Sequence, residues 1–183
     1  MNRDWDTIEF LRHVRHDWLN KIQLIKGNMA LNKKERVEEI IDDIILEAQQ
    51  EAKLSNLELP AFAAKILTSN WESYSFRLEY EVLNEQKCHG IEDFALTDWT
   101  SRFFSVLDKS IKKYHDNNLS VSIEPQLAET RLFFDFSGII EEKRLLIDFL
   151  QEELKDGFLV EKSDISDEEL TVELLIKQHK DKN

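Results

Sequence analysis

Two amphipathic segments joined by a short polar linker open the chain, and they constrain its fold more than any other feature. The first segment covers about residues 7–28, and the second follows Asn32, which forms a capping-box pattern with Glu35. Because the linker is short, the two helices must run antiparallel as a hairpin. The first helix carries an apolar seam at three- and four-residue spacing, in which Arg15 takes one place: Ile8, Leu11, Trp18, Ile22, Ile25 and Met29.

Two helices cannot cover their own apolar seams. The second helix has an apolar side and a strongly polar, mostly acidic side, and the apolar side is formed by Val37, Ile40, Ile41, Ile44, Ile45, Ala48, Ala52 and Leu54. A second copy of the chain would complete a four-helix bundle, and a two-fold dimer is the commonest way to do so. The alternative is that the C-terminal part of the same chain covers the hairpin.

The pattern changes after residue 57. Residues 77–82 alternate strictly between polar and apolar and predict a half-buried strand. Further helices are expected over residues 60–74, 97–115 (with Tyr114 in its apolar set) and 141–154, and further strands over residues 119–123, 131–136, 158–162 and 170–177. Helices alternating with antiparallel strands predict an α+β sandwich, with helices on one face of one sheet. We therefore expect a helical hairpin over residues 1–57 and an α/β sandwich domain over residues 58–183, ending in a loosely ordered segment from residue 178.

Composition narrows the classes of function. The 183 residues carry a net charge of −13, which argues against nucleic acid as a ligand. No apolar run approaches the roughly 18–20 residues that cross a bilayer, and the first residues lack the apolar core of a signal peptide. The single Cys88 excludes an intrachain disulfide and a cysteine-based zinc site. We expect a cytoplasmic protein without membrane contact.

His16 is the residue that suggests chemistry. It lies about 100° round the first helix from the apolar seam, so its imidazole is expected to be exposed. An exposed imidazole on a rigid helix is a usable nucleophile, although a lone surface histidine usually has no function. Residues 1–36 hold eight Lys and Arg against five acids, which suits an acidic partner or a phosphoryl group, or simply solvates the helix. His13 and His16 have the spacing of a metal-binding pair, but no carboxylate cluster completes a site, and we expect no metal.

Gly27 lies inside the first helical segment, where glycine costs about 1 kcal/mol relative to alanine. It would let another backbone or side chain approach the helix closely. The alternative is a kink, or an end of the helix before Asn28.

Residues 15–28 read RHDWLNKIQLIKGN, and this stretch resembles the phosphorylatable-histidine helix of the sporulation initiation phosphotransferase family of the Bacillus phosphorelay. Residues 51–57 and 78–83 also resemble that family, and the resemblance weakens after about residue 90. The shorter His-acid-x-x-Asn pattern within the stretch also occurs in citrate-type sensor kinases, which are the close alternative.

The resemblance implies a helical-hairpin dimer that relays a phosphoryl group reversibly, through His16, between the aspartates of two response regulators in sporulation initiation. It also implies a C-terminal domain related to the ATP-binding domain of histidine kinases. The residues expected to dock the receiver domains, from facing and family likeness, are Arg12, Arg15, Asp17, Asn20, Lys21, Gln23 and Gly27. Asp17 either orients the imidazole or only solvates the helix, and the sequence leaves both alternatives open.

The same resemblance separates a transferase from a kinase. Residues 134–140 stand where a kinase of this fold has an Asp-x-Gly-x-Gly loop, and only Gly138 is kept. Residues 106–114 resemble the kinase helix that supplies a magnesium-binding Asn, but no Asn stands there. We therefore expect no bound ATP or other cofactor, and Mg²⁺ only on the receiver partner. The alternatives are an ATP-dependent sensor kinase core and a non-catalytic dimerisation scaffold.

Overall fold

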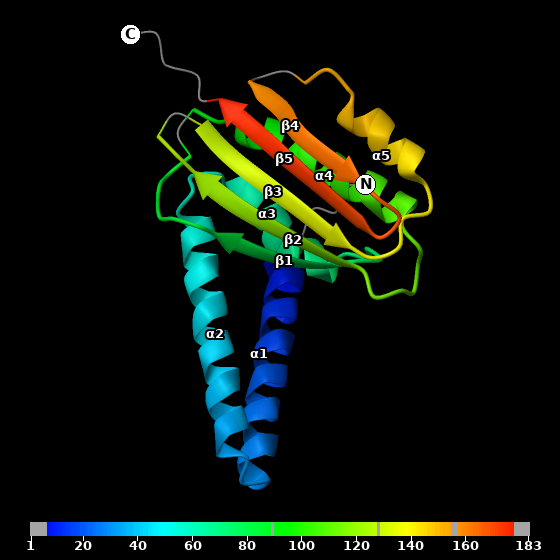
Figure 1. Cartoon of the computed structure of the whole chain (residues 1–183). Helices are drawn as coiled ribbons and strands as arrows, with labels where there is room; N and C mark the ends of the chain where they lie inside the picture. Colours follow the sequence, from blue (N-terminus) through cyan, green and yellow to red (C-terminus); the bar gives the residue numbers. More distant parts are fainter. Residues whose placement is uncertain (1–6, 89, 128, 155–156, 178–183) are drawn as a thin grey trace. The chain divides into compact units, whose positions relative to one another are not determined.

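The computed structural model describes residues 7–88, 90–127, 129–154 and 157–177 (Figure 1). The chain divides into two compact units, an N-terminal unit that ends at Gln49 and a C-terminal unit that begins at Gln50. The expected loose segment from residue 178 lies outside the described residues. None of the helices within the described ranges is long and apolar enough to cross a membrane.

Helix α1 spans Thr7–Ala30 and helix α2 spans Lys34–Ser55. Gly27 neither ends nor interrupts α1. The helix stops three residues later, where Asn32 adopts a left-handed backbone with φ of 54°. Asn32 N–H donates to Met29 O and Lys33 N–H donates to Asn28 O, both at 3.0 Å, which is the pair of bonds that closes a Schellman motif. The predicted capping box was therefore wrong, because Asn32 terminates α1 instead of starting α2.

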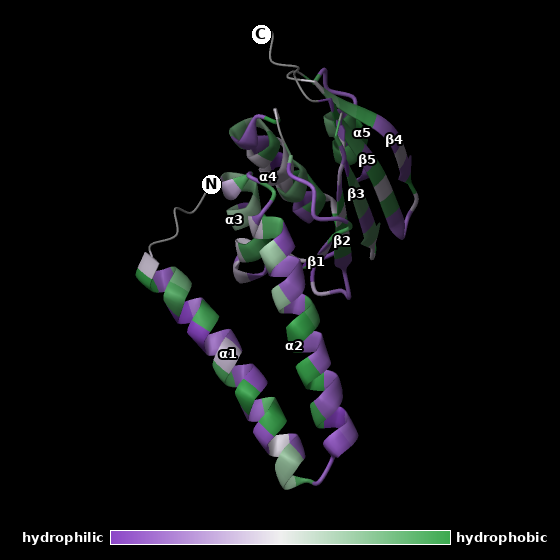
Figure 2. Cartoon of the chain, turned by 90° about the vertical axis from the view of Figure 1, so that its left-hand side faces the viewer, coloured by the Kyte–Doolittle hydropathy of each residue, from purple (hydrophilic) through white to green (hydrophobic). Residues whose placement is uncertain are grey.

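The hairpin is antiparallel, as predicted, and its helices diverge from the connecting turn (Figure 2). None of the 24 residues of α1, all of which are described, is buried. In the part of α2 that belongs to the N-terminal unit, residues 34–49, Ile40 is the only buried residue. An isolated helix is only marginally stable in water. Because α1 is amphipathic and has no buried side chain, its apolar seam needs a further surface to pack against.

The C-terminal unit is an α+β sandwich, which confirms the predicted class. Its elements are α3 (Pro60–Thr68), the 3₁₀ turn η1 (Ser69–Trp71), β1 (Arg77–Val82), α4 (Asp93–Ser110), β2 (Asn118–Pro125), β3 (Glu129–Ser137), α5 (Lys143–Leu150), β4 (Phe158–Ile165) and β5 (Glu169–Lys177). One sheet has the order β1-β2-β3-β5-β4, and α3, α4 and α5 lie on one face of it (Figures 1 and 2). The strand pairs are antiparallel except β1 and β2, which are parallel because α4 crosses over between them.

Alternating side chains of the strands and the inner sides of the helices form the core of this unit. Phe103 and Phe134, both essentially unexposed, have ring centroids 5.0 Å apart, and Trp99 stacks on Phe103 at 5.4 Å. Asp93 supplies the missing cap of α3, since its two carboxylate oxygens accept from Ala61 N–H and Phe62 N–H at 2.8 and 2.9 Å. The core thus depends on side chains from distant parts of the sequence.

Three helices end earlier than the sequence predicted: α3, α4 and α5, the last of which ends at Leu150 instead of about residue 154. After Thr68 the chain turns, because the Asn70 amide binds both the N–H and the C=O of Leu78 at 2.8 Å and so holds the turn against β1. Helix α4 ends at Ser110, whose carbonyl accepts from the N–H groups of Glu141 and Glu142. The prediction that Tyr114 belongs to the apolar side of this helix was wrong, and the residue is fully exposed.

The last turn of α2 belongs to the C-terminal unit. Leu54 is unexposed, and the Gln50 side-chain carbonyl accepts from Val82 N–H at 2.7 Å. Lys53 Nζ lies 3.4 Å from Val82 O. Together with Asn70 these contacts occupy backbone groups on the outer edge of β1, where an exposed strand would otherwise invite pairing with another chain.

Candidate functional site

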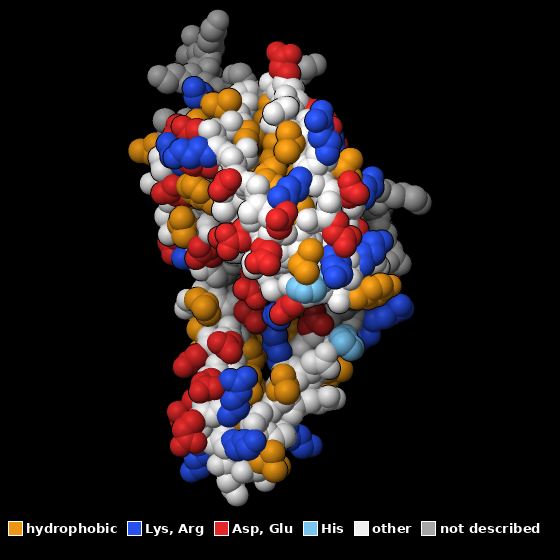
Figure 3. Space-filling view, turned by 45° about the vertical axis from the view of Figure 1, so that its right-hand side comes forward, with side chains coloured by type: hydrophobic (Ala, Val, Ile, Leu, Met, Phe, Trp, Pro, Cys, Tyr) orange, Lys and Arg blue, Asp and Glu red, His pale blue; other side chains and the backbone are white. Residues whose placement is uncertain are grey.

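Helix α1 has three sides that differ in burial and composition. One side turns toward α2 and is partly buried, with Phe10 and Val14 on it. The second side is the apolar seam predicted from the sequence, and there Ile8, Trp18 and Ile22 are 51–62% exposed. The third side, which carries His16, faces neither α2 nor the seam. Figure 3 shows hydrophobic side chains at the surface of the hairpin, among the charged ones.

The third side forms one stripe along the helix. Successive residues of an α-helix are about 100° apart, so Arg12, Asn20, Gln23 and Gly27 all lie within about 40° of His16. These four residues are exposed. The remaining docking candidates from the sequence lie about 100° or more from His16: Arg15 beside the seam, and Asp17 and Lys21 on the side of α2.

The His16 side chain is 71% exposed, and its Nδ1 has two polar neighbours. Asp17 Oδ1 lies 3.3 Å from Nδ1, and Asn20 Nδ2 lies 3.3 Å from the same atom. Among the described residues, no hydrogen-bond partner lies at Nε2 of His16. The two neighbours favour different tautomers: the Asp17 carboxylate only accepts and favours a proton on Nδ1, whereas the Asn20 amide nitrogen only donates and favours an unprotonated Nδ1. In the tautomer that Asp17 favours, the lone pair of Nε2 points to solvent and is free to act as a nucleophile.

Lys21 is held inside the hairpin. Its ammonium pairs with Glu47 of α2 and lies 5.9 Å from the centroid of the Trp18 ring. The sequence did not identify Glu47, because a pair separated by 26 residues depends on how the two helices face each other. Arg12 and Arg15, in contrast, have no ion pair with any residue of the described ranges and remain available to a partner.

Two further residues complete the surface around His16. Leu19 lies one turn after His16, outside the apolar seam, and is 50% exposed. Its spacing from His16 is the sequence signal that could have identified it as a contact residue. A Cβ built on Gly27 would meet nothing within 4 Å. The space beside Gly27 is therefore open in the single chain. No group of three or more His, Cys, Asp or Glu in the described part of the chain is arranged to hold a metal ion.

The segment after β3, where the sequence resemblance suggested a kinase-like loop, pairs with the segment after α4. Ile111, just after α4, forms an antiparallel bridge with Ile140, just after β3, and Lys112 N–H donates to Ile139 O at 2.9 Å. Gly138 is required by packing, because a Cβ there would lie 2.3 Å from Asn117 Oδ1. The one glycine kept in this loop thus has a structural reason that does not involve phosphates.

Comparison with known proteins identifies the relatives of the chain. Residues 58–177 match the family model of sporulation initiation phosphotransferase B, C-terminal, and residues 1–57 match that of the SpoOB-type sensor kinase alpha-helical domain. The chain is 37% identical, over 153 residues, to sporulation initiation phosphotransferase B of Bacillus subtilis (strain 168). That match covers 82% of this chain and 80% of the relative. The chain belongs to the sporulation initiation phosphotransferase B family.

Solved structures similar to the chain include histidine kinases. The catalytic domain of histidine kinase ThkA matches 73% of this chain and 92% of its own, with a TM-score of 0.44 and 11% identity. Histidine kinase AdeS of Acinetobacter baumannii matches 90% of this chain and 98% of its own, with a TM-score of 0.46 and 10% identity. The family model and the relative from Bacillus subtilis are both named as phosphotransferases, as the sequence resemblance predicted.

Proposed function

We propose that this member of the phosphotransferase family relays a phosphoryl group between the aspartates of two response-regulator receiver domains through Nε2 of His16. The observation that carries the proposal is the position of His16: an exposed imidazole in the middle of an exposed helical stripe, with its Nδ1 beside Asp17 and Asn20. The named phosphotransferase from Bacillus subtilis, which is similar over most of both chains, supports the reaction class.

The chemistry needs few groups from this chain. The Nε2 lone pair attacks the phosphorus of an aspartyl phosphate, a P–N bond forms, and the P–O bond to the partner aspartate breaks with release of its carboxylate. The aspartate of a second receiver then attacks the phosphohistidine in the reverse sense. Both intermediates are high-energy, so the relay is reversible. Phosphoryl transfer requires in-line positioning and charge neutralisation, and Mg²⁺ held by the receiver would supply much of the latter.

The docking surface is the His16 stripe together with its basic border. Arg12 and Arg15 offer unpaired cations on one side of the imidazole, and Leu19 offers an exposed apolar contact. Cations on a docking surface raise the rate of encounter with an acidic partner. Asn20, Gln23 and Gly27 extend the same stripe and allow close approach of a partner. Asp17 and Lys21 act from the side, Asp17 on the imidazole and Lys21 on the contact between the two helices.

The proposed assembly is a homodimer with a four-helix bundle. Apart from the partly buried Ile25, the apolar residues of the seam on α1 are about half exposed or more, and α2 also presents exposed Ile41, Ile45 and Leu46. A second hairpin would bury these side chains while leaving the His16 stripe open to receivers. We propose a cytoplasmic protein that binds no ATP, since residues 134–140 keep only Gly138 of the Asp-x-Gly-x-Gly pattern and residues 106–114 contain no Asn.

The test is transfer of label from a phosphorylated receiver domain to the purified chain, with His16→Ala and His13→Ala compared with the wild type. The proposal predicts acid-labile label on the wild type and on His13→Ala, and none on His16→Ala. Labelling of the wild type by ATP alone would favour the kinase alternative. Binding of receivers without transfer to any variant would favour the scaffold.

A further inference from the structure

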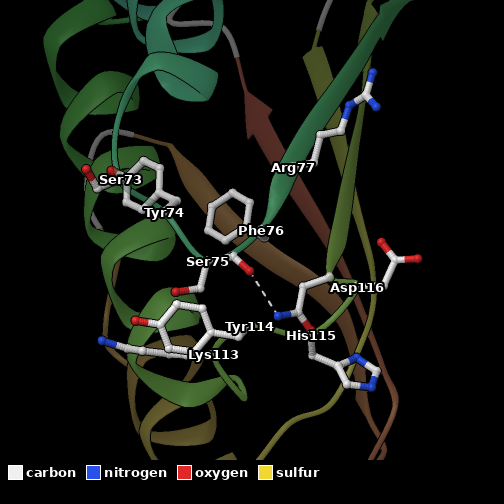
Figure 4. Close-up of a pocket in the computed structure, with 10 residues that line it drawn as sticks. Ser73, Tyr74, Ser75, Phe76, Arg77, Lys113, Tyr114, His115 and Asp116 are labelled. Atoms are coloured by element: carbon white, nitrogen blue, oxygen red, sulfur yellow. Dashed lines mark hydrogen bonds between the residues drawn. The ribbon is translucent and has the colours of Figure 1, made fainter.

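An open cavity of about 570 Å³ lies within the C-terminal unit. Its walls are two irregular segments: residues 73–77, which lead into β1, and residues 113–117, which connect α4 to β2 (Figure 4). Cavities of this size accommodate small molecules. The proposed phosphotransfer site on α1 makes no use of it.

Buried polar side chains fix both walls. Ser75 N–H donates to Asp108 Oδ1 at 2.6 Å, and Ser75 O accepts from Asn117 Nδ2 at 2.9 Å. Asn117 is 3% exposed, and its Nδ2 also donates to Lys112 O at 2.8 Å while its Oδ1 accepts from Ile139 N–H. One amide therefore joins three backbone segments. Such a satisfied network makes the shape of the cavity rigid before any ligand arrives.

A second buried network lies behind Tyr74, which lines the cavity. Lys65, 8% exposed, donates to the Tyr74 hydroxyl at 2.9 Å and to Glu72 Oε1 at 2.8 Å. Burial, and then the neighbouring Glu72, raise the pKa of Tyr74 above its ordinary range, so this wall stays neutral. The positive charge of Lys65 is compensated by Glu72 and is not offered to the cavity.

The groups that are offered are mostly hydrogen-bond donors. Ser73, Ser75, Lys113 and Tyr114 gather on one side in Figure 4, while Arg77, His115 and the single acid Asp116 extend from the other side. Tyr114 is fully exposed and has a φ of 59°, an unusual backbone for a bulky residue. Backbone N–H groups beside a left-handed residue form concavities that bind anions.

The charge of this loop contrasts with its surroundings. Residues 50–183 contain 27 acidic and 16 basic side chains, yet residues 109–115 contain three lysines and one histidine and no acid. Lys113 forms no ion pair within the described part of the chain, and Arg77 has only Glu79, 3.8 Å from its Nε. A cationic patch on an otherwise acidic surface raises the local concentration of small anions.

We propose that this cavity binds a small phosphorylated molecule. A phosphate group carries about two negative charges and several acceptor oxygens, which match two basic side chains and two serine hydroxyls better than a carboxylate with two oxygens does. Lys113 provides the main positive charge. The hydroxyl groups of Ser73 and Ser75 donate hydrogen bonds to the phosphate oxygens, and the exposed Tyr114 ring provides a surface for the rest of the ligand.

The experiment is isothermal titration of the full-length chain with inorganic phosphate and pyrophosphate, and with citrate at matched ionic strength. The proposal predicts saturable one-to-one binding of a phosphate probe, weakened about tenfold or more by Lys113→Glu and less by Ser75→Ala. Lys34→Glu makes the same charge change on an exposed residue of α2 that does not line the cavity, and it should leave the affinity within about twofold.

Three results would overturn the proposal: no saturable binding of either phosphate probe, equal affinity of Lys113→Glu and wild type, or citrate binding as tightly as pyrophosphate. Thermal unfolding of each variant checks the fold. Should Lys113→Glu prove destabilised, Ser75→Ala, which removes one hydroxyl oxygen, decides between the outcomes.

Discussion

In the C-terminal unit the large apolar side chains are enclosed by sheet and helices, whereas on α1 side chains of the same kind lie at the surface. Phe103 and Phe134 are essentially unexposed, while Trp18 and Ile22 of α1 are about half exposed. The proposed phosphotransfer chemistry lies on α1 too, on a side of the helix next to these apolar side chains. The comparison indicates that the C-terminal unit has a core of its own, whereas α1 has no buried residue. This difference is the reason for the proposed dimer, and the proposed reactive and docking groups lie on the helix with the least burial.

The largest effect is expected from breaking the enclosed core. Phe103→Ala removes a ring that contacts Trp99, Phe134 and Phe149, and should lower the free energy of unfolding by about 3–5 kcal/mol. Denaturant unfolding followed by tryptophan fluorescence measures the loss. Phe94→Ala, at a residue that is 74% exposed, is the control and should change stability by less than about 0.5 kcal/mol.

The next effect concerns the exposed seam. Ile22→Asp places a charge where we propose that a second hairpin packs, so the variant should sediment as a monomer while the wild type sediments as a dimer. Leu127→Asp, at the connection of β2 and β3, is more exposed still and should remain dimeric. A monomeric wild type, or a dimeric Ile22→Asp variant, would contradict the proposed bundle.

A smaller effect is expected at the cap of α3. Asp93→Ala removes acceptors from two backbone N–H groups, those of Ala61 and Phe62, and should cost about 1–2 kcal/mol. Thermal unfolding of the C-terminal unit is the measurement, and Asp98→Ala on the exposed side of α4 is the control. Equal destabilisation by both variants would show that Asp93 does not act as a cap.

The smallest change in stability should come from Gly27→Ala. Nothing lies within 4 Å of the added methyl group, so the helix should gain up to about 1 kcal/mol by propensity. If Gly27 serves close approach of a receiver, transfer slows although the helix is more stable. A variant that is both more stable and as fast as wild type would remove Gly27 from the docking surface.

The sequence predicted most of this fold where local patterns decide the structure. The strict alternation of residues 77–82 located β1 at its observed bounds, and the 3.6-residue period located α1 and the exposed face of His16. Errors arose where a competing local motif or a distant contact overrides the predicted pattern. Asn32 satisfies the capping-box pattern, but its left-handed backbone closes α1, and α4 stops at Ser110 because Glu141 and Glu142 bind its last carbonyl.

In the candidate site too, the features set by local spacing could be predicted from the sequence, and those set by contacts between distant segments could not. Facing around a helix follows from spacing, so Arg12, Asn20, Gln23 and Gly27 could be placed beside His16 from the sequence. Lys21 could not, because its partner Glu47 belongs to the other helix. The cavity near Tyr114 was missed since two segments about forty residues apart form it, although the run of lysines from residue 109 was a visible signal.

The most direct test of the account is to locate the phosphoryl group on the wild-type chain after incubation with a phosphorylated receiver domain. Phosphorus NMR at alkaline pH, with mass spectrometry of the peptide that contains residues 7–30, identifies both the residue and the nitrogen. The account predicts one phosphohistidine, at Nε2 of His16. Phosphate on His13 or His115, or on Nδ1 of His16, would contradict it.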